Sequence, residues 1–158
     1  MEVKLAQREK TIIGGFSVET TLENSGKEIG ELYKEFTNGK MQLLNSFTEN
    51  INEYYGVIWY TKFHEKYKYL LGQEIIIRSK DFEIKGIPKG QYVYSKFSKG
   101  YNGIKAWTEF YEKGIPEIGY KPIEKKDVAF EYYPNGLDGD YELWSLVEKN
   151  VWKNVGQV

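Results

Sequence analysis

The chain has 158 residues, a formal net charge of −1 at pH 7 and no cysteine. This length supports one domain with its own core, and the lack of thiols excludes disulfides, cysteine-ligated metal centres and cysteine nucleophiles. Lysine plus arginine (22) nearly balance aspartate plus glutamate (23), and neither sign forms a long block. The sequence therefore carries no electrostatic footprint of direct nucleic-acid binding.

Aromatic residues make up 16% of the chain, including 14 Tyr and 4 Trp. Their rings are apolar with one polar atom, which suits strands and equally suits a cavity for flat or cationic ligands. No apolar run has the length of a signal peptide or of the roughly 20 residues that span a membrane. We expect a cytoplasmic protein with no membrane contact and no cofactor.

The first quarter of the chain predicts two extended segments and a helix. Segments 3–8 and 11–20 have strand character, and a Gly-Gly pair allows a bend in the second. Ser25 and Glu28 have capping-box spacing, so a helix is expected to begin at Ser25. An Asn-Gly pair at 38–39 is expected to end it. Four residues mark its apolar face at helical spacing: Ile29, Leu32, Tyr33 and Phe36.

The middle of the chain predicts further strands. Segment 41–52 has a mixed pattern that fits either a short helix or a packed loop. Segments 53–61 and 66–77 are rich in Tyr, Ile and Val and are expected to be strands. Segment 81–88 is expected to cross to a second set of elements, and segment 91–98 alternates as a strand.

A second helix and a hairpin are expected to follow. Apolar residues at helical spacing cover 104–111, and Gly114 with Pro116 is expected to close this helix. Segment 118–122 reads as irregular. Segments 130–134 and 141–148 then form a hairpin, because Asn-Gly and Asp-Gly turn dipeptides lie between them. Strand alternation places Glu142, Trp144 and Leu146 on one face, and Tyr141, Leu143, Ser145 and Val147 on the other.

The two halves repeat one pattern. Residues 53–55 and 131–133 both read Glu-Tyr-Tyr, at an offset of 78, and the apolar stripes of the two helices match at an offset of 75. We infer a duplication, with pseudo-repeats over about 1–79 and 80–149. The expected fold is α+β: two β-α-β-β units related by a pseudo-twofold form a curved antiparallel sheet. Both helices would cover one face, and the concave opposite face would be the ligand cleft.

Five motifs follow one another in the second half: Ile-Pro-Lys-Gly-Gln-Tyr at 87–92, Trp107 in a helix ending Gly-Ile-Pro at 114–116, Gly-Tyr at 119–120, Phe-Glu-Tyr-Tyr-Pro at 130–134 and Tyr-Glu-Leu-Trp at 141–144. Their order resembles that of the gyrase-inhibitor-like (GyrI-like) effector-binding domains. The resemblance covers nearly the whole chain and is firmest from residue 87 onward. It implies the duplicated β-α-β-β fold.

The resemblance also implies a function. GyrI-like domains are drug-sensing modules of AraC-type and MerR-type transcription regulators, or stand-alone proteins. They bind bulky, often cationic, aromatic compounds against an acidic residue, and some stand-alone relatives hydrolyse cyclopropane-bearing alkylating agents inside an aromatic cage. Strand character begins at Val3 here with no helix-turn-helix pattern before it, so we expect the stand-alone form.

Two carboxylates are candidates for the acidic residue. Glu142 lies on a strand with few other charges, where it would attract a lipophilic cation or act as a general base. The alternative is a glutamate that points to solvent or pairs with a lysine. Glu131 has the same ambiguity and a repeat mate, Glu53, so we favour Glu142. Cage candidates, each also consistent with ordinary core packing, are Trp144, Trp107, Tyr111, Tyr94, Trp59, Tyr69 and Phe16.

No metal site is expected, because His64 is the only histidine and has no ligand at metal-site spacing. We treat it as a surface residue. The predicted function is capture of bulky aromatic or cationic xenobiotics, which would protect the cell. The alternatives are a hydrolase that opens cyclopropane rings with water, and a module that binds a protein partner such as gyrase. The sequence indicates neither the ligand nor the oligomeric state.

Overall fold

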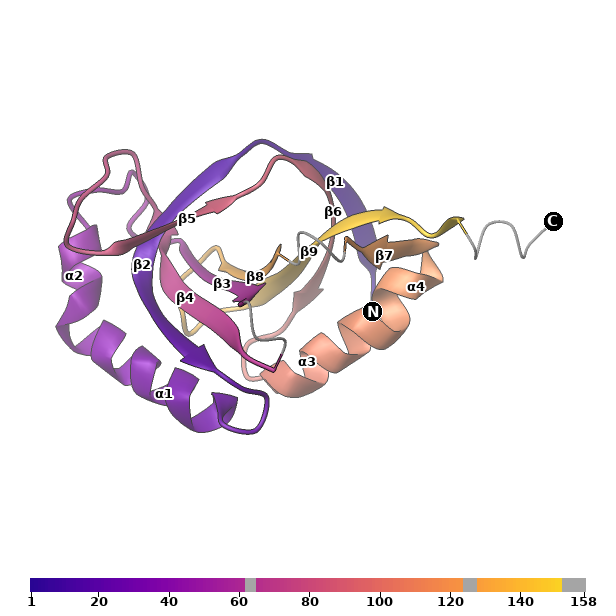
Figure 1. Ribbon diagram of the computed structural model, residues 1–158, viewed down its shortest axis with the longest axis horizontal. Coiled ribbons are helices and arrows are strands. Elements are labelled where there is room, and N and C mark those ends of the chain that lie inside the picture. The colour runs from indigo at the N-terminus through magenta and orange to yellow at the C-terminus, as the bar shows by residue number, and fades with distance from the viewer. Residues whose placement is uncertain (62–64, 124–127, 152–158) are drawn as a thin grey trace.

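Two halves with a similar order of elements, the second with one additional short strand, make up the fold of the computed structural model, which describes residues 1–61, 65–123 and 128–151 (Figure 1). The first half contains β1 (Val3–Arg8), β2 (Thr11–Thr20), α1 (Ser25–Glu35), the π-helical turn η1 (Phe36–Lys40), α2 (Met41–Leu44), β3 (Tyr54–Tyr60) and β4 (Tyr67–Glu74). The second contains β5 (Glu83–Ile87), β6 (Gly90–Phe97), α3 (Gly103–Glu109), η2 (Phe110–Gly114), α4 (Ile115–Glu117), β7 (Tyr120–Pro122), β8 (Val128–Tyr133) and β9 (Tyr141–Lys149).

The strands form one antiparallel sheet in the order β1-β6-β9-β8-β3-β4-β2-β5, with β7 added to β9. The predicted α+β class with a curved antiparallel sheet is confirmed. Each half-sheet is ordered alike around the central β3–β8 pair. Tyr54 pairs with Tyr133 there and Tyr55 with Tyr132, so the two Glu-Tyr-Tyr segments lie side by side at the middle of the sheet.

The two ends of the sheet meet. β1 and β2 are successive strands of the chain that border the first half of the sheet, and β5 and β6 are successive strands that border the second half. β1 pairs with β6 and β2 with β5, and the partner residue numbers add up to the same value in both ladders. One long antiparallel ladder thus joins the edges, and the sheet curls into a barrel-like ring (Figure 1).

Two cores result from this curvature. The helix-side core packs the helices against one face of the sheet and includes Leu32, Phe36, Phe110, Tyr69 and Leu143. The interior core fills the space within the ring, with Ile13, Tyr55, Val57, Tyr92, Phe130, Trp144 and Leu146. Alternation along β9 is as predicted, because Leu143 and Val147 join the first core while Trp144 and Leu146 join the second.

Some local predictions differ from the structure. α1 begins at Ser25 as expected, but without a capping box: the Ser25 hydroxyl donates to the Leu22 carbonyl, and Glu28 accepts from Thr20. The chain bends at Gly39 (φ 153°) and continues as a helix to Leu44. Segment 81–88 contains a strand rather than only a crossover, and segment 118–122 ends in the short strand β7.

The offset between the two helices is 74 rather than the predicted 75. The buried residues Leu32 and Phe36 of the first helix correspond to the buried Ala106 and Phe110 of the second, and the π-helical turns begin at Phe36 and Phe110. Tyr33 is therefore the counterpart of Trp107. This correspondence matters because both side chains reach the same carboxylate network.

Candidate functional site

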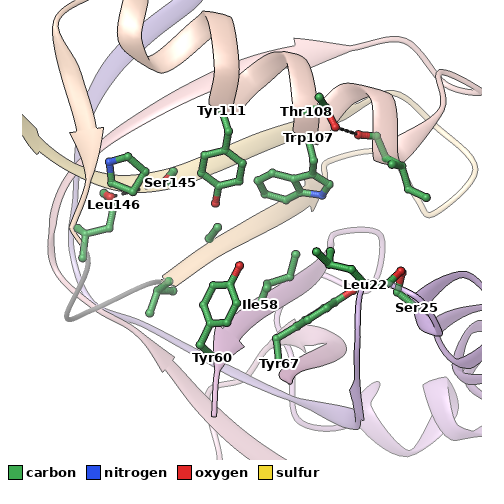
Figure 2. A pocket seen from close by; sticks show the side chains of 14 residues that line it. Leu22, Ser25, Ile58, Tyr60, Tyr67, Trp107, Thr108, Tyr111, Ser145 and Leu146 are labelled. Carbon is green, nitrogen blue, oxygen red and sulfur yellow. Dashed lines mark hydrogen bonds between the residues drawn. The ribbon is translucent and has the colours of Figure 1, made fainter. Parts of the chain in front are cut away.

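A cavity of about 520 Å³ lies between the start of α1 and the exposed side of α3, above the ends of β3, β4, β8 and β9 (Figure 2). Its walls are apolar and aromatic, with hydroxyls of serine and threonine at the edges. Among the described residues that line it, none carries a charge. The predicted cleft lay on the face away from the helices, whereas this cavity lies on the helix side, because the interior core fills the opposite face.

Two aromatic pairs face each other across the cavity (Figure 2). Trp107 and Tyr111 lie one turn apart on the second helix, and their rings stack with centroids 5.5 Å apart. Tyr60 ends β3 and Tyr67 begins β4; they are direct partners in the ladder, with ring centroids 6.3 Å apart. Helical and hairpin geometry thus supply one aromatic pair to each wall.

The rim of the cavity is unusually apolar. Leu22 and Ile104 have 84% and 69% of their surface exposed, and Tyr60 and Tyr111 have 53% and 40%. Large apolar side chains at this exposure have a cost in water, and a gathering of them at one mouth is typical of a binding surface.

A hydrogen-bonded carboxylate lies behind the aromatic wall. Glu131 Oε1 accepts from the hydroxyls of Tyr69 (2.6 Å) and Tyr133 (3.1 Å), and Oε2 accepts from Trp107 Nε1 (3.2 Å). Tyr33 adds an outer contact, donating to the Tyr133 hydroxyl at 3.0 Å. The Glu131 carboxylate network, as we call these five side chains, joins both helices to the centre of the sheet.

Burial and hydrogen bonding act in opposite directions on Glu131. Burial raises the pKa of its carboxyl, while the bonds from Tyr69, Trp107 and Tyr133 lower it; burial is the larger effect. The negative charge of Glu131 in turn raises the pKa of Tyr133, after burial, which is the larger cause. Three donors directed at one carboxyl suit its ionised form, because a carboxylate only accepts hydrogen bonds.

Gly56 makes room for this network. It lies opposite Glu131 in the β3–β8 ladder. A Cβ at this position would collide with the Tyr69 hydroxyl and would lie 2.6 Å from Glu131 Oε1. Only a residue without a side chain therefore permits the short bond between Tyr69 and Glu131.

The structure brings together four of the predicted site residues. Trp107 and Tyr111 line the cavity, while Tyr69 and Glu131 lie directly behind it. Of the two candidate glutamates, Glu131 belongs to the network that contacts the cavity wall, whereas Glu142 accepts from Trp144 on the other face of the sheet.

Glu142, Trp144 and Tyr94 form a separate cluster on the other face of the sheet. Trp144 stacks between Tyr94 and Phe130, with centroids 4.3 Å and 5.6 Å apart and interplanar angles of 8°. The guanidinium carbon of Arg8 lies 4.8 Å from the Trp144 ring and 4.9 Å from the Phe130 ring, and Trp144 Nε1 donates to Glu142. This predicted cage is thus packed in the interior core, with a cation of the chain itself over it.

The two other cage candidates also lie away from the cavity. Trp59 faces the opposite side of β3, where the ammonium groups of Lys85 and Lys68 lie 4.6 Å and 5.7 Å from its ring. Phe16 contacts Phe36 edge to face at 6.4 Å, on the periphery of the helix-side core. His64 lies outside the described residues.

Sequence reasoning missed part of the site. Tyr60 and Tyr67 were treated only as strand residues, although their position at the two ends of a turn put them at one edge of the sheet. Tyr33 and Tyr133 were not singled out either. The available signal for Tyr133 was the repeated Glu-Tyr-Tyr motif, because Tyr133 is the last residue of its second copy and pairs with Tyr54 at the centre of the sheet.

Two further findings concern the described part of the chain. No group of three or more His, Asp or Glu residues there is placed to hold a metal ion. None of the helices of residues 1–61, 65–123 and 128–151 is both long enough and apolar enough to cross a membrane.

Comparisons with known proteins place the chain among effector-binding proteins. The Cass2 family model, described as integron-associated effector binding protein, matches residues 4–146. A DNA gyrase inhibitor of Serratia proteamaculans (strain 568) is 32% identical over 76 residues, which are 45% of this chain and 47% of that protein. The match thus spans about half the length of that curated relative.

Solved structures share the fold. An integron cassette protein from the mobile metagenome of Vibrio cholerae has a TM-score of 0.69 and 16% identity, over 92% of this chain and 95% of the other. A protein solved bound to tetraphenylphosphonium has a TM-score of 0.67 and 15% identity, over 94% of each chain. At these identities the likeness establishes the fold alone.

Proposed function

The chain belongs to the family of integron-associated effector-binding proteins, and on that premise we propose that its cavity between α1 and α3 captures flat, lipophilic aromatic molecules, above all cations. One observation carries this proposal. A cavity whose described lining residues carry no charge, with two facing aromatic pairs, has a hydrogen-bonded carboxylate directly behind one of its walls. Capture of such molecules would keep them from other targets, and the predicted protective role is part of the proposal.

The preference for cations follows from the charges around the cavity. Trp107 is both a wall of the cavity and a donor to Glu131, so the carboxylate lies one side chain away from a bound ligand. Its field reaches the opposite wall as well: burial raises the pKa of Tyr67, and the negative charge of Glu131 raises it further. A lipophilic cation would meet aromatic faces and a negative potential in a site with little water.

Capture fits the geometry better than hydrolysis. A general base needs a free lone pair directed at a water molecule in the substrate site. Glu131 instead accepts three hydrogen bonds and reaches the cavity only through Trp107. We therefore assign it the role of a counter-charge, and the predicted hydrolase activity becomes an outcome of the binding experiment.

The test uses tetraphenylphosphonium as a cationic probe and triphenylphosphine oxide as a neutral aromatic control. Calorimetry with the full chain is expected to show binding of the cation, with a raised melting temperature. Glu131→Gln, after a check of its fold by circular dichroism, is expected to weaken cation binding about tenfold, or about 1.4 kcal/mol, and to leave the neutral control unchanged. Glu142→Gln is the matched control and is expected to bind like the wild type.

Three results would contradict the proposal. Equal affinity for the cation and the neutral compound would remove the role of charge. A loss confined to Glu142→Gln would move the site to the other face of the sheet. Recovery of a cyclopropane-bearing probe with one added water, detected by mass spectrometry, would make the protein a hydrolase.

A protein partner is a second candidate function, favoured by the exposed apolar rim of the cavity. Leu22 and Ile104 stand out from the surface there, and the partial match to a gyrase inhibitor suggests the partner to try first. A supercoiling assay with purified gyrase tests it. Inhibition by the wild type that is lost in Leu22→Ser with Ile104→Ser would support this function, and no inhibition would reject it for gyrase.

A further inference from the structure

Lys85 differs from the other partly buried lysines that the structure describes. There are four such lysines: Lys40, Lys68, Lys85 and Lys121. All but Lys85 are ion-paired to a glutamate. The Lys85 ammonium group has neither an ion pair nor a hydrogen bond to any described residue, and its Nζ lies 4.6 Å from the centroid of the Trp59 ring.

The contact between Lys85 and Trp59 depends on the curl of the sheet. Lys85 lies on β5 and Trp59 on β3, and two strands, β4 and β2, separate them in the sheet order. Strands three positions apart in a flat sheet lie about 14 Å from each other, and the curl of the ring shortens that path. Lys85 shares its face of β5 with Ile87 of the interior core, so its side chain lies on the inner face of the ring.

A second lysine beside the same indole is already neutralised. Lys68 is the ladder partner of Trp59, and its Nζ lies 5.7 Å from the ring centroid. The same Nζ is 3.3 Å and 3.4 Å from the two carboxylate oxygens of Glu83, and the Ser17 hydroxyl donates to Glu83 Oε1 at 2.9 Å. Of these three charged side chains, Lys85 alone therefore has no counter-charge in contact.

Burial lowers the pKa of the Lys85 ammonium, because the indole and the sheet exclude water that would stabilise its charge. Glu83 acts in the opposite direction, and the positive charge of Lys68 adds to the lowering of this pKa. At a given pH such a lysine has more free amine than an ordinary surface lysine, and the free amine is the nucleophile. Lys85 also keeps part of its surface exposed, so a small molecule can reach it.

From this geometry we infer that Lys85 is a nucleophilic amine that captures aromatic aldehydes as Schiff bases. The Nζ lone pair attacks the carbonyl carbon, so that a C–N bond forms and the carbonyl oxygen becomes a hydroxyl. The two protons of the amine then leave with that oxygen as water, and a C=N double bond remains. The Trp59 ring offers a flat face on which the ring of the aldehyde can stack, which favours aromatic over aliphatic aldehydes.

The test exposes the full chain at neutral pH to less than one equivalent of benzaldehyde and traps the imine with cyanoborohydride. Peptide mass spectrometry then locates the adducts and separates those on lysines from that on the N-terminal amine. The adduct at Lys85 is expected to exceed that at any other lysine by at least about fivefold. Lys68, beside the same ring but paired with Glu83, is the internal control. Butanal, an aliphatic aldehyde, is expected to label Lys85 more slowly.

Two variants separate the causes of this reactivity. Glu83→Gln removes a negative charge that favours the ammonium form, so it is expected to label Lys85 about twofold faster and to make Lys68 reactive as well. Trp59→Leu, after a check of its fold by circular dichroism, returns Lys85 to water and removes the flat face. Its labelling at Lys85 is expected to fall about fivefold, to that of an exposed lysine such as Lys10, with no preference for benzaldehyde.

Several results would overturn the inference: labelling spread over the exposed lysines, equal labelling of Lys68 and Lys85, equal rates for the two aldehydes, or a folded Trp59→Leu variant labelled as fast as the wild type. The site is also separate from the function proposed for the cavity. Thr108→Trp, which fills the cavity, is expected to abolish tetraphenylphosphonium binding and to leave Lys85 labelling unchanged. Failure of tetraphenylphosphonium to bind, with normal labelling, would overturn the proposed function and leave the Lys85 site in place.

Discussion

Replacing Gly56 by alanine tests the Glu131 carboxylate network in one step. The added methyl group would collide with the Tyr69 hydroxyl and would lie 2.6 Å from Glu131 Oε1, so the 2.6 Å bond between these groups must open. A crowded core costs about 1–3 kcal/mol, and a hydrogen bond to a charged group contributes about 1.5–3 kcal/mol. Gly56→Ala is therefore expected to lower the free energy of unfolding by about 2.5–6 kcal/mol.

The assay is urea unfolding followed by tryptophan fluorescence and circular dichroism. Gly86→Ala is the matched control in a strand, because its new Cβ would meet only the ends of the Lys10 and Ile12 side chains, at 3.3 Å and 3.7 Å. That variant is expected to lie within about 0.5 kcal/mol of the wild type.

A double variant identifies the cause of the loss. In Gly56→Ala with Tyr69→Phe, the hydroxyl bond is lost only once, so the total loss is expected to be at least about 1 kcal/mol smaller than the sum of the two single losses. Additive losses would show that the alanine does not act through Tyr69. A Gly56→Ala variant as stable as Gly86→Ala would refute the geometry of the network itself.

Three further predictions concern the same chain. Trp107→Phe leaves Glu131 Oε2 without its donor, so urea unfolding is expected to show a loss of about 1–3 kcal/mol; an unchanged midpoint would contradict the bond. Because burial raises the folded-state pKa of Glu131, the free energy of unfolding should fall as pH rises from the ordinary carboxyl range through that raised value. Glu131→Gln should show a flatter pH profile in that window, and parallel profiles would reject the assignment. Arg8→Ala removes the cation over Trp144 and Phe130 and is expected to cost about 0.5–2 kcal/mol, with Arg8→Lys between it and the wild type in thermal unfolding.

Local patterns in the sequence predicted most of the elements. The Asn-Gly and Asp-Gly pairs placed the β8–β9 hairpin, and alternation along β9 assigned Trp144 and Leu143 to opposite faces. These features depend on neighbours in the chain. The two copies of the Glu-Tyr-Tyr motif lie at β3 and β8, which pair in the middle of the sheet, but the sequence indicated only a duplication and not this pairing.

The closure of the sheet could not be predicted in the same way. It depends on pairing between β1–β2 and β5–β6, which are far apart in sequence and have no motif that identifies them as partners. Closure turns the face of Trp144 and Phe130 into the inside of a ring, and Arg8 then covers their rings. The predicted cage has the aromatic residues that a cation site needs, but the guanidinium group of Arg8 already lies over its rings.

The sequence could not decide between Glu131 and Glu142 for the same reason, because the contacts that distinguish them come from distant parts of the chain. Glu131 and Glu142 both follow aromatic residues on neighbouring strands, so local pattern treats them alike. The difference lies in donors from distant elements: Tyr69 is 62 residues away from Glu131, and Trp107 comes from the second helix. Such contacts are visible only once the sheet and helices are assembled.

The most direct test of the proposed site is a crystal structure of the chain with tetraphenylphosphonium. The ligand is expected between α1 and α3, with phenyl groups against Trp107 and Tyr67 and its positive centre on the Glu131 side of the cavity. Density for the ligand beside Trp144 and Glu142, on the far face of the sheet, would contradict the proposed site and restore the cleft first predicted from the sequence.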